Sequence, residues 1–123
     1  MRLPAVAVAA ILLLPVLGRA ADADPDSGQR VFKAQCGTCH AAVAGRNLTG
    51  PSLAGLIGRK AGDVPGFHYS EANGAAGFTW DAARLDTYLA DPKAVIPGTS
   101  MMYNGLKNDE KRADLIAYLE TLK

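Results

Sequence analysis

The sequence is poor in cysteine and has almost no excess charge of either sign. Only 2 of its 123 residues are cysteine, which excludes a scaffold of several disulfides and a zinc site with four cysteine ligands. The 13 Lys and Arg nearly balance the 12 Asp and Glu, so the strongly basic face of a nucleic-acid-binding protein is not expected. Alternating strand patterns and internal repeats are also missing. The composition, 49% hydrophobic and 20% charged, is typical of one small globular domain.

One long apolar run is present, and it lies at the start of the chain. Arg2 supplies a basic start, residues 5–17 are almost entirely apolar, and small residues followed by acidic sequence come next. This order is typical of a secretory signal peptide. The run is shorter than the ~20 apolar residues that a membrane-spanning helix needs, although an uncleaved membrane anchor is the alternative. We therefore expect residues 1–20 to be a signal peptide, with cleavage possible up to residue 23, and the protein to be periplasmic.

The mature chain that export would leave is nearly neutral. Loss of Arg2 and Arg19 with the signal peptide would change the net charge from +1 to near −1. We expect a short polar extension at residues 21–26 and one domain at residues 27–123. No later segment is long or apolar enough to span a bilayer, so we expect no stable membrane insertion. We also expect a monomer.

Glycine and proline divide the domain into helices and long loops. Asp26 is the expected N-cap of a first helix that ends near Gln35, because Gln29 completes a capping box. Residues 41–68 hold glycine or proline every few positions and predict one long loop. A loop of this length in a small domain indicates that something besides side chains fills the interior.

The second half of the domain carries the other expected helices. A single turn is expected at residues 70–73, and a longer helix at 80–90, capped by Thr79 and ended by an Asp-Pro pair. Asn108 is the expected cap of the last helix. Apolar residues of that helix recur at helical spacing: Leu115, Ile116, Leu119 and Leu122. The expected fold class is all-α. Because so few short helices cannot form a large hydrophobic core, a bound apolar cofactor would supply the missing part of it.

Residues 36–40, Cys-Gly-Thr-Cys-His, are the strongest chemical signal in the chain. C-x-x-C-H is the attachment signature of c-type haem. On one tight turn, the thiols of Cys36 and Cys39 can each add to a haem vinyl group, and His40 can lie beneath the iron as its proximal ligand. We therefore expect haem c attached covalently through Cys36 and Cys39, with its iron bound by His40.

Three other sites can use the same cysteines. A thioredoxin-like dithiol needs a strand–helix setting that the sequence does not show. A zinc ion could take Cys36, Cys39 and His68, but no fourth ligand is evident. A disulfide between Cys36 and Cys39 would close a loop too small to stabilise the fold much. The haem site is the interpretation that the motif and the expected export favour.

Beyond this motif, the sequence resembles the class I cytochromes c, most closely the short mitochondrial type and related bacterial members. The resemblance follows family order over nearly all of residues 27–123. The segments that carry it are Thr49–Leu53, Pro65–Asn73, Gly77–Trp80, Tyr88–Lys93, Pro97–Met101 and Leu115–Leu119. It implies the class I cytochrome c fold, in which three main helices and one or two short ones wrap around a covalently bound haem.

The resemblance implies Met101 as the second axial ligand of the iron. Residues 97–101 are similar to the family's methionine loop, whereas the neighbouring Met102 would point elsewhere and pack as an ordinary apolar residue. His68 falls in a surface loop of the family. A neutral thioether stabilises ferrous iron and raises the potential, so we expect a closed, six-coordinate site.

The family pattern also implies further residues around the haem. Pro51 matches the proline whose carbonyl accepts the other ring N–H of the haem histidine, a bond that fixes the orientation of the ring. Tyr88 matches a tyrosine that hydrogen-bonds near the methionine sulfur, and Thr99 is another nearby polar position. Four residues match positions around a haem propionate: Arg59, Tyr69, Asn73 and Trp80.

The first and last helices cross in this family, and the sequence keeps the residues of that crossing. Gly28 permits close backbone approach between the two helices. Four residues match the crossing and are interpreted as structural: Gly28, Phe32, Leu115 and Tyr118.

Several surface positions depart from the mitochondrial pattern. Gln35 and Ser100 stand where those relatives have lysine, and Tyr103 stands where the family often has phenylalanine. Lys93 and Lys107 remain at matching places. With a mature charge near −1, we expect weaker long-range steering toward partners than in a strongly basic carrier.

The resemblance implies a soluble periplasmic single-electron carrier and not an enzyme. We expect transient redox partners such as a cytochrome bc complex, a terminal oxidase or a photosynthetic reaction centre. The alternative is a haem-containing domain or subunit of a peroxidase, reductase or dehydrogenase complex, which would need an open distal position or a permanent partner.

Overall fold

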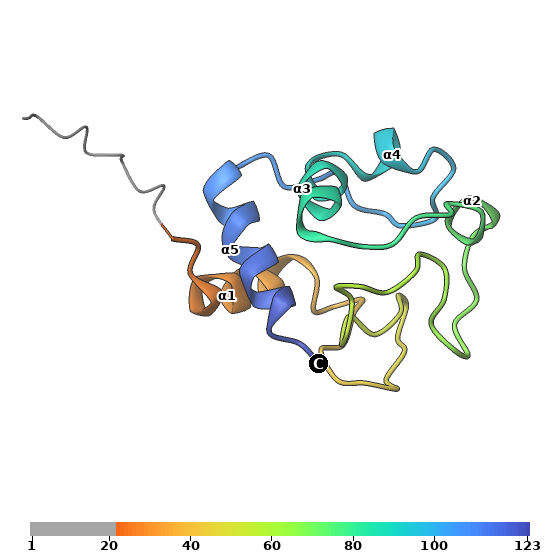
Figure 1. Cartoon of the computed structure of the whole chain (residues 1–123), viewed down its shortest axis with the longest axis horizontal. Coiled ribbons are helices and arrows are strands. Elements are labelled where there is room, and N and C mark those ends of the chain that lie inside the picture. The colour runs from red at the N-terminus through yellow and green to blue at the C-terminus, as the bar shows by residue number, and fades with distance from the viewer. Residues whose placement is uncertain (1–21) are drawn as a thin grey trace, which may run out of the picture.

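Helices and long loops make up residues 22–123, the part of the chain that the structure, a computed structural model, describes (Figure 1). The helices are α1 (Pro25–Gln35), α2 (Glu71–Gly74), α3 (Ala82–Ala90), α4 (Pro92–Val95) and α5 (Asp109–Glu120). No strand forms within this range, where one isolated bridge pairs Lys60 with Thr79. The all-α fold class is confirmed. The expected signal peptide, residues 1–20, lies outside the described residues.

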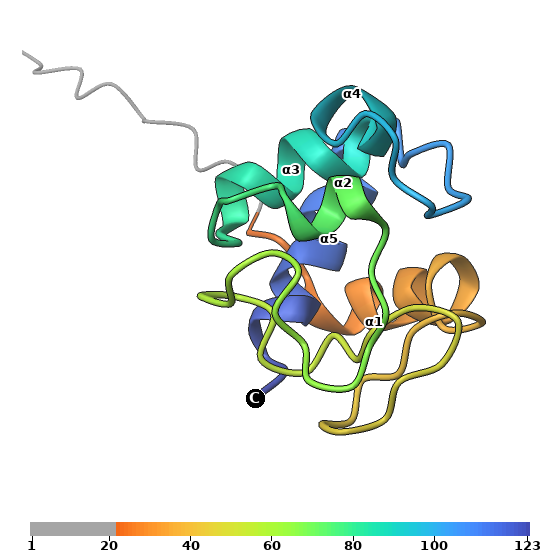
Figure 2. The same cartoon turned by 90° about the vertical axis from the view of Figure 1, so that its right-hand side faces the viewer.

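Helices α1 and α5 cross in close contact (Figures 1 and 2). Gly28 lies at the crossing, because an added Cβ would clash with the Asp114 carbonyl group and lie 2.8 Å from the Cβ of Tyr118. The ring of Phe32 packs on the ring of Tyr118, with a centroid distance of 5.4 Å. Leu115 is fully buried. The predicted crossing is confirmed, and it depends on glycine at position 28.

Helix α1 begins earlier than the sequence predicted. The Asp24 carboxylate accepts a hydrogen bond from the Asp26 amide at 2.9 Å and is the N-cap. The prediction of Asp26 as the cap is therefore wrong. Pro25 occupies the first turn, where its fixed φ and missing N–H carry no cost, so the helix starts ahead of the expected position.

Helix α3 begins at Ala82, after a cap formed by Asp81, whose carboxylate accepts a backbone N–H of the first turn at 2.7 Å. The prediction of a helix from residue 80 with Thr79 as its cap is wrong. Trp80 lies in an irregular segment, and its amide donates to the Arg59 carbonyl at 2.9 Å. A pairing between segments far apart in the sequence overrides the local helix signal.

Helix α4 was not predicted from the sequence. Asp91 ends α3 and also caps α4, because its carboxylate accepts the Ala94 amide at 3.4 Å. Pro92 follows in the first turn, which suits a helix start. The Asp-Pro pair therefore both ends one helix and begins the next.

Helix α5 follows its prediction, with the Asn108 side chain accepting a backbone N–H of the first turn at 2.9 Å. Arg112 of this helix is buried, and its guanidinium donates to the Asp86 carboxylate and to the Leu106 carbonyl. Arg112 therefore ties α5 to α3 and to the loop that precedes α5. Three residues of the predicted apolar stripe are buried: Leu115, Ile116 and Leu119.

Long loops complete the described part of the fold (Figure 2). Residues 36–70 run without a helix, in agreement with the loop predicted for residues 41–68, and residues 96–108 form the return to α5. None of the helices in the described part is long and apolar enough to cross a membrane. The loops and helices share a cavity.

Candidate cofactor site

The long loops, α3 and α5 surround a cavity of about 240 Å³. It is lined by side chains from both halves of the chain, which the fold brings together. Every predicted site residue is in the lining: Cys36, Cys39, His40, Pro51, Arg59, Tyr69, Asn73, Trp80, Tyr88, Thr99 and Met101.

The turn after α1 carries the two thiols and the imidazole. The amides of Cys39 and His40 both donate to the Cys36 carbonyl, at 3.0 and 2.9 Å. This tight turn brings both sulfur atoms and the ring to one cavity, in the arrangement that haem attachment requires. Within residues 22–123 no disulfide joins Cys36 to Cys39, so both sulfur atoms are left for haem attachment. Burial raises the pKa of the Cys36 thiol to about 11, so the thiol is protonated at neutral pH.

His40 is held by the loop beside it. Its Nδ1 lies 2.7 Å from the Pro51 carbonyl oxygen, so Nδ1–H donates in the neutral ring and Nε2 keeps its lone pair. Burial lowers the pKa of His40, which favours the neutral form that binds metals. Gly50 leaves room for the ring, because an added Cβ would lie 2.6 Å from Nδ1.

Met101 is partly buried and lies within reach of two hydroxyl groups. The Tyr88 hydroxyl donates to the Met101 sulfur at 3.7 Å. The Met101 amide donates to the Thr99 hydroxyl oxygen at 3.3 Å. Burial raises the pKa of Tyr88, so its hydroxyl keeps its proton and remains a donor.

The neighbouring Met102 is 92% exposed, although it lies at the edge of the same cavity. The prediction that it packs as an apolar core residue is wrong. Successive side chains of a non-helical chain tend to face opposite sides, so Met102 faces solvent where Met101 faces the cavity. His68 is exposed, as the resemblance implied.

The polar part of the lining is tied to the backbone and to itself. Arg59 donates to two carbonyls within residues 52–54, at 2.9 and 3.3 Å. The Asn73 carbonyl oxygen accepts the Thr99 hydroxyl at 2.8 Å, and the Tyr69 hydroxyl accepts a backbone N–H at 3.1 Å. These contacts hold the polar side chains in place around the cavity.

Sequence reasoning missed most of the apolar wall. Leucines from a loop, α3 and α5 complete the lining, although two of them were assigned only to helix packing. They are Leu53, Leu56, Leu85, Leu89, Leu115 and Leu119. Helical spacing marks a buried face, but it does not indicate whether that face meets protein or a cofactor.

This set of residues fits a c-type haem. Two thiols and an imidazole come from one turn, a thioether and the polar side chains come from other segments, and leucines form the walls. In residues 22–123, no three or more His, Cys, Asp or Glu side chains gather as a metal site, so the zinc alternative has no support.

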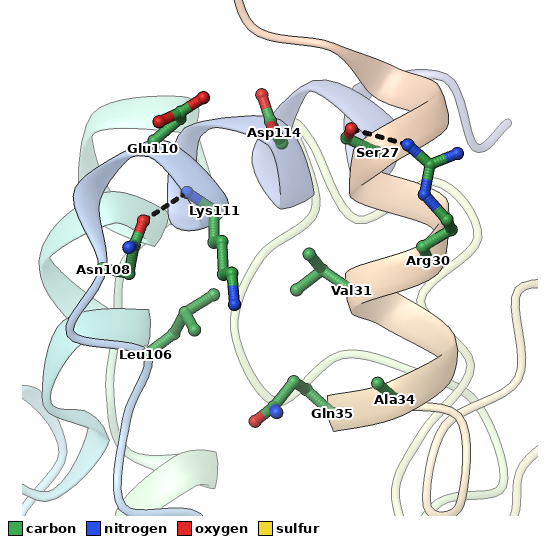
Figure 3. Close-up of a pocket in the computed structure, with 10 residues that line it drawn as sticks. All are labelled: Ser27, Arg30, Val31, Ala34, Gln35, Leu106, Asn108, Glu110, Lys111 and Asp114. Carbon is green, nitrogen blue, oxygen red and sulfur yellow. Dashed lines mark hydrogen bonds between the residues drawn. The ribbon is translucent and has the colours of Figure 1, made fainter.

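A second hollow of about 500 Å³ lies between α1 and the start of α5 (Figure 3). Arg30 lines it and donates to the Ser27 hydroxyl at 2.8 Å, while Glu110, Lys111 and Asp114 contribute mixed charge. Gln35 lines both hollows. The second hollow lacks the thiols, the imidazole and the thioether, so it is not the cofactor site.

Comparison with known proteins agrees with this geometry. Residues 25–123 match the family model described as cytochrome c. The chain is 47% identical over 106 residues to cytochrome c2 of Rhodopila globiformis, covering 86% of this chain and 100% of that protein. It is 50% identical over 102 residues to cytochrome c2 iso-2 of Magnetospirillum fulvum, covering 83% of this chain and 100% of that protein. It is also 50% identical over 99 residues to cytochrome c type-1 of Ascaris suum, covering 80% of this chain and 88% of that protein. The chain therefore belongs to the cytochrome c family, whose members carry electrons on a covalently bound haem c.

Proposed function

We propose that this chain is an exported single-electron carrier, with His40 and Met101 as axial ligands of the iron of haem c. The observation that carries the proposal is that one cavity holds two thiols, an imidazole and a thioether. When bound, the haem supplies a one-electron redox couple. The residues of the chain would hold the iron, orient the side chains that bind it and exclude water.

The proximal side depends on the Pro51 carbonyl. Because this carbonyl accepts a hydrogen bond from Nδ1–H of His40, Nε2 is left for the metal, and the ring orientation is set by the protein. Such a hydrogen bond also strengthens the donor nitrogen. Gly50 supports this role, since a larger residue would displace the ring.

The distal side distinguishes a carrier from an enzyme. A protein ligand at this position closes the iron to small substrates, whereas a peroxidase or a reductase needs it open. Met101 supports the closed state, because the hydroxyl groups of Tyr88 and Thr99 restrain its sulfur and its amide. The neutral thioether favours ferrous iron, which gives a higher potential than a harder ligand.

The polar lining is assigned to the haem propionates. A buried carboxylate needs hydrogen-bond donors. Guanidinium, phenol, amide and indole groups can all donate. The residues that carry these groups in the cavity are Arg59, Tyr69, Asn73 and Trp80.

The partners that fit are membrane-bound redox complexes that the protein meets transiently in the periplasm. A cytochrome bc complex, a terminal oxidase and a photosynthetic reaction centre are all of this kind. The apolar run at residues 5–17 supports export, and relatives named cytochrome c2 support a bacterial carrier. Fast exchange needs a small and weak interface, so that release does not limit turnover.

Spectroscopy of the Met101→Ala variant tests the axial pair. The oxidised wild type should show the long-wavelength thioether-to-iron absorption band and bind cyanide slowly. The variant should keep its covalent haem, lose the band and bind cyanide rapidly. Its reduction potential should fall by well over about 59 mV, the shift that corresponds to a tenfold change in a one-electron equilibrium constant.

The matched control is Met102→Ala, which removes the adjacent exposed thioether. This control should leave the absorption band, the cyanide kinetics and the potential unchanged. An unchanged potential in Met101→Ala, or loss of the band in Met102→Ala, would contradict the ligand assignment.

Kinetics with isolated membranes test the partners. We expect purified protein to be reduced and oxidised by membranes that contain the candidate complexes, at rates that rise with its concentration. Stable co-purification with a dehydrogenase or a reductase would instead support the subunit alternative.

A further inference from the structure

Gln35 and Tyr103, which lie far apart in the sequence, contact each other. The Tyr103 hydroxyl donates to the Gln35 side-chain carbonyl oxygen at 3.1 Å, across 68 positions of sequence. Both residues line the haem cavity. The bond needs these two side-chain types, because lysine at position 35 would offer no acceptor and phenylalanine at position 103 would offer no hydroxyl.

The two partners flank the two sides of the proposed iron site. Gln35 is the last residue of α1 and directly precedes Cys36, the first haem-attachment cysteine. Tyr103 follows Met101 by two positions. Figure 3 shows the Gln35 side chain leaving the end of α1 on the side that faces the segment entering α5. The bond therefore joins the attachment turn to the methionine loop.

With the residues that follow Met101 included, the methionine loop covers residues 97–105, and the residues directly after it are anchored to α3. The Leu106 amide donates to the Leu89 carbonyl at 2.7 Å, and the Lys107 ammonium donates to the Ala90 carbonyl. Toward α1, the bond from Tyr103 to Gln35 is the one hydrogen bond that this loop makes within residues 22–123. Loss of that bond would free the side of the loop next to the attachment turn and leave its anchor on α3 in place.

We propose that Tyr103 is a positioning residue that restrains the methionine loop through Gln35 and so keeps Met101 in place. Loop opening is a local event that needs few contacts to break, and it limits the entry of an external ligand. The proposal rests on the proposed ligation of iron by His40 and Met101. Tyr103 itself does not touch the iron in this proposal.

Cyanide binding to the oxidised haem protein measures the opening. Tyr103→Phe keeps the ring and removes only the hydroxyl, so we expect the cyanide association rate to rise about three- to fivefold, the effect of one partly exposed neutral hydrogen bond. Gln35→Leu should give the same increase. Gln35→Glu keeps an acceptor and should restore a rate near that of the wild type.

The double variant Gln35→Leu with Tyr103→Phe distinguishes a shared bond from two separate effects. If the bond is responsible, the double variant should bind cyanide no faster than either single variant. The proposal would be overturned if the rate increases of the two single variants multiplied in the double variant. It would also be overturned if Tyr103→Phe bound cyanide at the wild-type rate. Tyr118→Phe is the control, because this ring packs on Phe32 at the crossing of α1 and α5 and takes no part in the bond between Tyr103 and Gln35.

Hydrogen exchange separates this proposal from the proposed function. Amides of residues 100–104 should exchange about three- to fivefold faster in Tyr103→Phe, while amides of α1 and α5 keep the wild-type rates. This readout does not depend on Met101 binding iron. Absence of the thioether band in the wild type would reject the ligand assignment alone, whereas unchanged exchange in Tyr103→Phe would reject the restraint alone.

Discussion

The crossing of α1 with α5 and the loops around the cavity are held together in different ways. At the crossing, Gly28 lets two backbones meet, and the rings of Phe32 and Tyr118 pack beside them. In the loops, single polar contacts recur, as where Asn47 accepts the Ser52 amide at 3.1 Å and donates to a backbone carbonyl at 3.2 Å. At the crossing α1 and α5 pack directly on each other, whereas the loops, together with leucines of α3 and α5, line the cavity.

This contrast shows which part of the protein depends on its cofactor. A crossing made by backbone contact and ring packing gains its stability from protein atoms alone. Loops that line a cavity gain apolar burial only when something fills it.

Removal of the attachment chemistry should have the largest effect. In Cys36→Ser with Cys39→Ser, or in His40→Ala, we expect loss of nearly all mature haem protein, because the loops lose the group that completes their core. Mass spectrometry and circular dichroism measure haem content and helix content. A haem-free chain with wild-type protection of residues 41–68 from hydrogen exchange would contradict the proposed dependence.

Gly28→Ala should damage the crossing itself. The added methyl group would overlap the Asp114 carbonyl, and overpacking against backbone should lower the free energy of unfolding by about 3 kcal/mol. Denaturant unfolding of the haem protein measures this change. Gly74→Ala, in α2, is the matched control: its methyl group meets nothing within 4 Å, and it should change the free energy of unfolding by less than about 1 kcal/mol.

Arg112→Leu should weaken the junction between the two regions. The buried guanidinium donates to the Leu106 carbonyl at 2.9 Å, and its loss leaves that oxygen without the bond, at a cost of about 2 kcal/mol in the free energy of unfolding. The Asp86 carboxylate is more than half exposed and contributes less. Lys111→Leu, at the exposed neighbouring position, is the control. Equal unfolding midpoints for the two variants would contradict a special role for Arg112.

The cap of α1 should give the smallest effect, and it should depend on pH. Hydrogen bonding from the Asp26 amide lowers the pKa of Asp24 below its ordinary value of 3.8. The stabilisation is therefore complete above that ordinary value and is lost as the pH falls through the lowered one. Thermal unfolding of Asp24→Asn should differ slightly from the wild type at neutral pH and converge with it in acid. Asp26→Asn is the control, because it keeps both the Asp24 carboxylate and the backbone amide that this carboxylate accepts.

Local sequence patterns correctly predicted those features that depend on residues within one or two helical turns of each other. The Asn108 cap and the apolar spacing of α5 belong to this class, as does the attachment motif at residues 36–40. The cap of α3 was predicted wrongly because Trp80 bonds to Arg59, a partner that no local pattern reveals. The local pattern also did not predict which of two adjacent apolar residues is buried, because Met102 is exposed.

The site itself divides in the same way. The motif alone predicted Cys36, Cys39 and His40, because one turn of chain is enough to bring their side chains together. Met101 and the polar lining came from the family resemblance, since no spacing rule connects them to the motif. The leucine walls were missed because an apolar face does not identify what covers it.

By itself, the sequence determined the helical class, the covalent chemistry at residues 36–40 and the family of the chain. The helical class and the attachment motif depend on neighbouring residues, whose relations are set by the chain's own geometry. The family follows from segments spread in order along the whole domain. Only the tertiary structure decided that Tyr103 meets Gln35, that Lys107 lies at the end of α3 and that Met102 faces solvent. Such contacts depend on how distant segments pack around a shared cavity, and that packing is a property of the whole fold.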